Sequence, residues 1–268
     1  MKITTSFSNA DIIAFCKATM DFNIVHSPEY MSFHKKEVVV PGMYLFSYLS
    51  SKLLSSCTTM VKSNTIEIFL GSLISAGEQV ELLVDAAKET GTWFLSAINS
   101  KDCFRVGENR SSISFNDHPT LTSTQSHNRG LPVTSEQLSL FKSLLHDISK
   151  EWLDLLFTIT YASQALFKAI ASPLDEVESE INLLLDKSKN PDQVSPFYQW
   201  LKIEIPGERI SLSLDKPIDY HISFNRESAN RAYIANVECR QEDKLFYYSR
   251  YKLIAIPDRL IMRMAKSM

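Results

Sequence analysis

Apolar residues at helical spacing predict two long helices, one in each half of the chain. In residues 42–56, Met43 and Phe46 begin an apolar face, and further apolar positions cover the segment almost all round. Residues 151–171 have the same character, starting from Trp152. A helix that is apolar on all sides is a buried helix. Each half of the chain is therefore expected to enclose one helix in its core.

Short runs rich in β-branched and aromatic residues follow each of these helices, with turn signals between them. The predicted strands are 65–69, 79–88, 92–100 and 104–115 after the first helix, and 199–205, 210–214, 220–225, 229–240 and 244–256 after the second. A helix followed by an antiparallel meander thus occurs twice, which predicts an α+β fold built from two similar units. Two such units can pair their sheets edge to edge, which removes two exposed edges.

Shorter segments complete this outline. A strand is expected within residues 2–7, a helix capped by Ser8 and ending near Thr19, and a helical turn at 28–34. Further helices are predicted at 135–149 and 175–187. A polar stretch between the halves, rich in Ser and Thr and containing Pro119, is typical of a linker. The predicted division is a first unit at 1–117, a linker at 118–137 and a second unit at 138–268.

The composition of the chain excludes several classes of function. The chain has 268 residues, 44% of them hydrophobic, and its net charge is -3. No stretch is strongly basic, so nucleic acid is not an expected partner. No apolar run approaches the roughly 20 residues of a membrane helix, and no signal peptide is recognised, so a cytoplasmic protein is expected. Four cysteines are scattered without metal-type spacing and predict free thiols: Cys16, Cys57, Cys103 and Cys239.

The candidate chemistry lies between the first two predicted helices. Asp21 and His26 are five positions apart in a loop, and Gly42 opens the first buried helix. An Asp and a His that converge can share a water and move protons near neutral pH. A helix N-terminus offers N–H groups that can hold a carbonyl oxygen as it gains negative charge. These groups together suit addition or removal of water beside a polarised carbonyl.

Two runs in this region resemble the MaoC-like family of (R)-specific enoyl-thioester hydratases and dehydratases. The first is Asp21-Phe22-Asn23-Ile24-Val25-His26, which resembles the family's Asp-x-Asn-Pro-Ile/Val-His motif. The second is Val39-Val40-Pro41-Gly42-Met43, which is similar to its Pro-Gly-Met element at the start of the central helix. Ile24 stands where the family has Pro. The resemblance covers roughly residues 3–115 and implies a hotdog fold, a long helix wrapped by an antiparallel sheet.

The resemblance also implies roles. Asp21 and His26 would be the catalytic pair that activates or expels water, Asn23 would brace the loop, and the Gly42 N–H would bind the thioester carbonyl. The implied enzyme is a lyase, a dehydratase or hydratase acting on acyl thioesters of acyl carrier protein or coenzyme A in fatty-acid or polyketide metabolism. The reaction needs no metal and no other cofactor.

The second half shows no Asp-x-x-x-x-His run. Its Asp219-Tyr220-His221 stretch falls in a predicted strand and not before a helix, so it is interpreted as structural. The resemblance therefore implies a tandem, or double, hotdog whose C-terminal half completes the pocket, although many double-hotdog members carry the motif in that half. Such a chain is a pseudo-dimer, present as a monomer or as a homodimer. Two alternatives stay open at this stage: a hotdog thioesterase and a non-catalytic acyl-binding or partner subunit.

Overall fold

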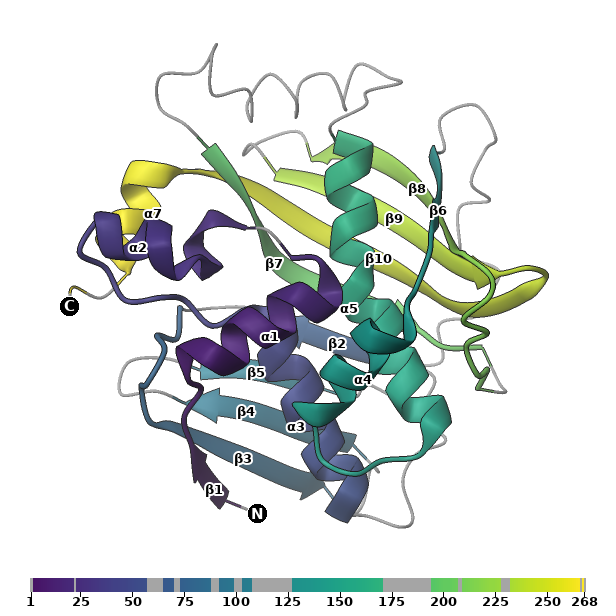
Figure 1. The fold of residues 1–268 in the computed structure, drawn as a ribbon, viewed down its shortest axis with the longest axis horizontal. Helices are drawn as coiled ribbons and strands as arrows, with labels where there is room; N and C mark the ends of the chain where they lie inside the picture. Colours follow the sequence, from purple (N-terminus) through teal and green to yellow (C-terminus); the bar gives the residue numbers. More distant parts are fainter. Residues whose placement is uncertain are drawn as a thin grey trace.

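The protein is an α+β structure in which helices pack against one antiparallel sheet (Figure 1). The computed structural model describes residues 2–21, 23–56, 65–69, 73–87, 92–98, 103–107, 127–170, 194–206, 209–227, 232–265 and 267. The helix predicted at 175–187 and the end of the strand predicted at 104–115 lie outside these described residues.

The elements of the first half follow the predicted order. They are β1 (Lys2–Thr5), α1 (Asn9–Thr19), η1 (Ile24–His26), α2 (Pro28–Phe33), α3 (Gly42–Ser56), β2 (Thr65–Phe69), β3 (Val80–Ala87), β4 (Thr92–Ile98) and β5 (Cys103–Gly107). The predicted cap of α1 is present, because the Ser8 hydroxyl accepts from the Asp11 N–H and the Asp11 side chain accepts from the Ser8 N–H.

The second half repeats the pattern of a strand, helices and four further strands, and it ends with an additional helix. Its elements are β6 (His127–Leu131), α4 (Ser135–Ser143), α5 (Lys150–Ile170), β7 (Val194–Glu204), β8 (Ile218–Glu227), β9 (Ala232–Gln241), β10 (Lys244–Pro257) and α7 (Asp258–Met264). Neither β6 nor α7 is among the predicted elements. β6 falls inside the range predicted as a linker, and it pairs with β8. The division into two units at this linker stays a prediction.

Each half contributes five strands of the described sheet, in the same order. The order is β1-β3-β4-β5-β2-β7-β10-β9-β8-β6. The five strands of each half can be numbered in chain order. Read from the outer edge of the sheet to its centre, both halves then have the order first, third, fourth, fifth, second. The halves meet where β2 pairs with β7 in antiparallel fashion, with Ile68 opposite Leu201. Both of these side chains are buried, so the core continues across the junction.

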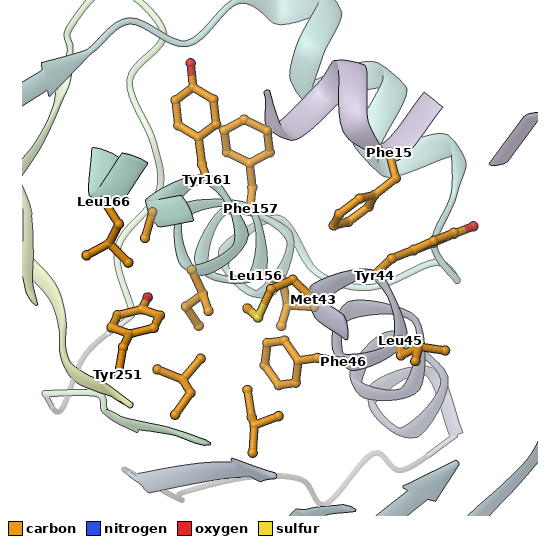
Figure 2. Packing of buried hydrophobic residues seen from close by; sticks show 14 of the residues in the cluster. Phe15, Met43, Tyr44, Leu45, Phe46, Leu156, Phe157, Tyr161, Leu166 and Tyr251 are labelled. Carbon is orange, nitrogen blue, oxygen red and sulfur yellow. The ribbon is translucent and has the colours of Figure 1, made fainter. Parts of the chain in front are cut away.

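Aromatic contacts join the helices of the two halves. Phe15 of α1 stacks on Tyr44 of α3, with ring centroids 4.8 Å apart, and lies 6.0 Å from Phe141 of α4. Phe141 in turn meets Phe157 of α5 edge to face at 5.4 Å. Figure 2 shows the rings of Phe15 and Tyr44 side by side, close to α5. Because α1 is held from both halves, its C-terminal end has a fixed position between them.

Two predicted elements differ from the structure, and in both regions a distant side chain accepts a hydrogen bond from a backbone N–H group. The strand predicted at 210–214 is irregular, since the Leu212 N–H donates to Asp154 Oδ2 at 2.8 Å and the Ser213 N–H to Gln241 Oε1 at 2.8 Å. The helix predicted at 135–149 stops at Ser143, and beyond it the His146 N–H donates to Ser51 Oγ at 3.2 Å. The other predicted strands are confirmed, with shifted ends.

Candidate active site

Asp21 is placed by the end of α1. The helix ends at Met20, which has φ 56° and ψ 35°, and the N–H groups of Met20 and Asp21 both reach the Cys16 carbonyl. A non-glycine residue in this left-handed region is uncommon and carries a small backbone strain. The turn reverses the chain and leaves the Asp21 side chain only 9% exposed. A carboxylate is thus held almost out of water just beyond the C-terminal end of α1.

His26 lies at the end of η1 and is fixed by one of its own ring nitrogens. Nδ1 lies 2.7 Å from the Val39 carbonyl oxygen, which can only accept, so Nδ1 carries a proton. The other ring nitrogen, Nε2, lies 3.9 Å from Asp21 Oδ2. The His26 side chain is also 9% exposed. The fold therefore brings the acid and the imidazole together with the reactive imidazole nitrogen facing the carboxylate.

Asn23 organises the loop between them. Its backbone N–H donates to Asp21 Oδ1 at 3.1 Å, and its side-chain Oδ1 accepts from the Val25 N–H at 3.4 Å. Its carbonyl accepts from the His26 N–H at 3.0 Å. Asn23 thus bonds the Asp21 side chain on one side and the backbone of Val25 and His26 on the other. Asp and Asn favour such turns because their side chains bond the backbone two residues on.

The start of α3 is tied to the same loop. The Val39 N–H donates to the Val25 carbonyl at 3.0 Å, and the Val40 N–H to the Ile74 carbonyl at 2.8 Å. The first bonds within α3 run from Tyr44 and Leu45 to the Pro41 carbonyl. Gly42 and the residue after it therefore have N–H groups with no acceptor inside the helix. The first of these N–H groups belongs to Gly42, three residues after Val39, whose carbonyl oxygen bonds His26. The positive end of the helix dipole lies at the same place.

The Asp21–His26 distance matters chemically. At 3.9 Å, Nε2 and Oδ2 are too far apart for a hydrogen bond with each other. A water lying between them can donate to both when Nε2 is neutral and the carboxylate is ionised, because both are then acceptors. A substrate hydroxyl has one hydrogen, so it can donate to one member of the pair and accept from the other when that member carries a proton. The arrangement suits moving protons to and from an oxygen.

The charge of Asp21 reaches both halves of the chain. Burial raises the pKa of the Cys16 thiol, and the Asp21 carboxylate raises it further, so this thiol stays protonated. Burial raises the pKa of Tyr198, on β7 of the second half. A Ser163 hydrogen bond opposes that rise, whereas Tyr251 and Asp21 add to it. The sequence did not single out Tyr198, because it precedes the strand predicted at 199–205.

Other residues considered from the sequence take ordinary structural roles. Lys36 donates to the Ala265 carbonyl and to Ser267 Oγ, both at 3.1 Å, and so fixes the C-terminal end of the chain. Asp219 and His221 lie in β8, as predicted. Within the described residues, no three His, Cys, Asp or Glu side chains gather closely enough to hold a metal ion.

No known family model and no curated protein matches this sequence. Solved structures do resemble it. A MaoC-like dehydratase is 10% identical with a TM-score of 0.51, and the match covers 95% of this chain and 97% of that one. The bifunctional dehydratase-cyclase domain from ambruticin biosynthesis is 8% identical with a TM-score of 0.54, over 98% of this chain and 93% of that one.

A third resemblance is to the peroxisomal multifunctional enzyme type 2 of Drosophila melanogaster, at 10% identity and a TM-score of 0.53. It covers 94% of this chain and 48% of that enzyme. Likenesses at such low identity concern the fold alone. The chain has a hotdog-like α+β fold, with an antiparallel sheet and a buried helix, which confirms that part of the prediction. None of the helices in the described part of the chain is long and apolar enough to cross a membrane.

Proposed function

We propose that this chain is an (R)-specific 3-hydroxyacyl-thioester dehydratase, or in reverse a 2-enoyl-thioester hydratase. The observation that carries the proposal is the nearly buried Asp21–His26 pair, 3.9 Å apart, beside the start of α3. A hotdog-like fold of the kind seen in a MaoC-like dehydratase supports it. The enzyme is then a hydro-lyase acting on thioesters of acyl carrier protein or coenzyme A in fatty-acid or polyketide metabolism.

The proposed reaction balances protons within the pair. In dehydration the C2–H and C3–O bonds break, the C2=C3 double bond forms, and water leaves. One member of the pair takes the C2 proton, and the other, which carries a proton at the start, gives it to the departing hydroxyl. The number of protons on the Asp21–His26 pair is unchanged, and a proton passes between the two groups through water before the next turnover. Because both groups lie on one side of the substrate, the elimination is syn.

The thioester carbonyl is assigned to the start of α3. Removing the C2 proton pushes negative charge onto this oxygen, and N–H groups at a helix N-terminus stabilise such charge. Gly42 supplies the first of these groups, and bonds from the Val39–Val40 segment hold it in register with His26. Asn23 acts as a positioning residue, because its contacts lie on Asp21 and on the loop.

We further infer that the chain is a tandem hotdog with one active site. The identical strand order of the two halves and their antiparallel junction at β2 and β7 support a duplicated unit. The second unit then takes the place of the partner in a dimer of single hotdogs, so a monomer or a homodimer of this pseudo-dimer is expected. The same reading makes residues 1–117 the catalytic unit and 138–268 the unit that completes the pocket.

A substrate screen tests the proposed function. Enoyl thioesters of graded length, on acyl carrier protein and on coenzyme A, are incubated with the full chain and read by mass spectrometry. The expected result is that the enoyl thioester gains the mass of one water with its thioester bond intact, which gives the 3-hydroxyacyl thioester. Release of the free thiol identifies a thioesterase instead. Tight binding with no change of mass at any length identifies a non-catalytic acyl-binding subunit.

A further inference from the structure

A short antiparallel ladder outside the named strands holds residues 38–40. The Ala76 N–H donates to the Val38 carbonyl at 2.7 Å. The Val40 N–H donates to the Ile74 carbonyl at 2.8 Å. In an antiparallel pair, a residue between two bonded positions directs its own N–H and carbonyl away from the partner segment. The middle residue of 38–40 therefore points its backbone groups toward a different part of the chain.

This middle residue is Val39, which lies opposite Ser75 in the ladder. Its N–H donates to the Val25 carbonyl at 3.0 Å, and its carbonyl oxygen lies 2.7 Å from Nδ1 of His26. Val39, Val25 and Ser75 are all buried. The backbone that fixes the His26 ring is thus itself fixed by residues 74–76.

A turn closed by Glu78 follows this ladder. The Glu78 N–H donates to the Ser75 carbonyl at 3.2 Å, and the Ser75 N–H donates to Glu78 Oε2 at 3.1 Å. Gly77, the third residue of the turn, has a φ of 74°, which is typical of a type II turn. The Ser75 N–H belongs to a buried residue and points away from the ladder, so the Glu78 carboxylate supplies the acceptor that it needs.

We propose that Glu78 is a positioning residue for His26 and that it fixes the tautomer of the imidazole. The catalytic consequence of this inference rests on the proposed function. Each step between the two residues is a hydrogen bond, through the Ser75 N–H, the ladder and the Val39 carbonyl. In a neutral imidazole one nitrogen carries a hydrogen and the other accepts. With the hydrogen held on Nδ1, Nε2 is the nitrogen that exchanges a proton beside Asp21.

Loss of the Glu78 carboxylate should loosen the turn without changing either member of the pair. The Val39 carbonyl is then held less firmly, and part of the His26 population takes the tautomer with its hydrogen on Nε2. A neutral ring in that form cannot accept a proton at Nε2. A hydrogen bond to a charged group is worth about tenfold in an equilibrium, so kcat should fall by about that factor. KM should stay within about twofold, because no group assigned to the thioester is altered.

Long-range proton–nitrogen NMR of the full chain, isotope-labelled in its histidine rings, reads the tautomer directly at a pH where imidazole is neutral. His26→Ala identifies the His26 signals. The unmodified chain should show the hydrogen on Nδ1, and Glu78→Ala should also show the form with the hydrogen on Nε2. Hydration of crotonyl-coenzyme A by Glu78→Ala should be about tenfold slower in kcat. Glu78→Gln keeps an oxygen that can accept from the Ser75 N–H, so it should retain both the tautomer and the rate.

The second half offers a matched control. The Gln137 side chain accepts from the Thr134 N–H, also three residues earlier, at 3.0 Å. Gln137→Ala removes this bond at the start of α4 and should leave the His26 tautomer and kcat unchanged. Gly77→Ala changes the turn in another way, because a side chain disfavours the positive φ although its Cβ would meet no atom within 4 Å. It should shift the tautomer as Glu78→Ala does, and it decides the question if Glu78→Ala does not fold.

Three results overturn the inference. The first is that His26 keeps its hydrogen on Nδ1 alone in the folded turn variants. The second is an equal tautomer shift in Gln137→Ala, which shows a general loss of order. The third is a hydrogen on Nε2 in the unmodified chain. If the tautomer shifts as expected but the unmodified chain hydrates no enoyl thioester, the proposed function fails and the positioning role of Glu78 stands.

Discussion

Three buried tyrosines in the second half allow a sharp test of its core. The hydroxyls of Tyr220 and Tyr247 both donate to the Thr158 carbonyl of α5, at 2.8 Å and 3.0 Å. The hydroxyl of Tyr251 is buried and has no hydrogen-bond partner among the residues that the structure describes, although Ser249 and Tyr247 are polar neighbours. Burial raises the pKa of all three phenols, so each remains a neutral donor at working pH.

The three Tyr→Phe substitutions should therefore have opposite consequences. Phe fills the same space as Tyr, so only the hydroxyl is lost. Losing a donor bond to Thr158 should lower the free energy of unfolding by about 1 kcal/mol in Tyr220→Phe and in Tyr247→Phe. An unpaired buried hydroxyl costs about 1–3 kcal/mol, so Tyr251→Phe should be neutral or more stable than the unmodified chain.

Urea unfolding of the purified chains, followed by circular dichroism, measures these differences. The double variant Tyr220→Phe/Tyr247→Phe should lose about 2 kcal/mol or more, because the Thr158 carbonyl then has neither tyrosine donor. The reasoning is refuted if Tyr251→Phe is destabilised as much as the other two, or if neither Tyr220→Phe nor Tyr247→Phe changes the unfolding midpoint.

Three further predictions concern stability elsewhere in the chain. Ser8→Ala removes the cap of α1 and should lower the free energy of unfolding by about 1 kcal/mol, measured by urea unfolding with Ser8→Asn as the control that keeps a cap. Asp154→Ala leaves the buried Leu212 N–H without its acceptor and should cost about 1–3 kcal/mol, whereas Asp154→Asn, which keeps an oxygen, should cost less. Burial and the nearby Lys52 lower the pKa of His146, so the unfolded chain binds the proton more readily. Stability should fall as the pH drops through the ordinary histidine value of about 6.5 toward the lowered one, and His146→Gln should flatten that part of the profile.

The sequence predicts those parts of the fold that depend on local pattern. The cap at Ser8 and the buried helix from Gly42 are examples, because spacing and side-chain chemistry within a few residues decide them. The irregular stretch around Leu212 was missed because a distant carboxylate, Asp154, takes its backbone N–H. A contact between residues far apart in the chain leaves no local signal.

The candidate site likewise contains residues that the sequence indicates, while a neighbouring strand has a feature that the sequence does not indicate. Asp21 and His26 were singled out because they lie close in sequence, and the structure brings them within 3.9 Å, although their roles stay a prediction. Tyr198 was missed because Gln199 is an extra residue in β7 opposite β10, a bulge that places Tyr198 opposite the buried Leu253. A bulge depends on how two strands pair, and neither strand alone shows it.

The central claim is that Asp21 and His26 carry out the chemistry. The direct measurement is the rate of hydration of crotonyl-coenzyme A by Asp21→Asn and His26→Ala, beside Asp219→Asn and His221→Ala as matched controls from β8. Each site variant should lose about a hundredfold or more in kcat, since a general acid or base contributes at least that much, while the controls keep their rate. Full activity in either site variant, with the unmodified chain active, would contradict the account.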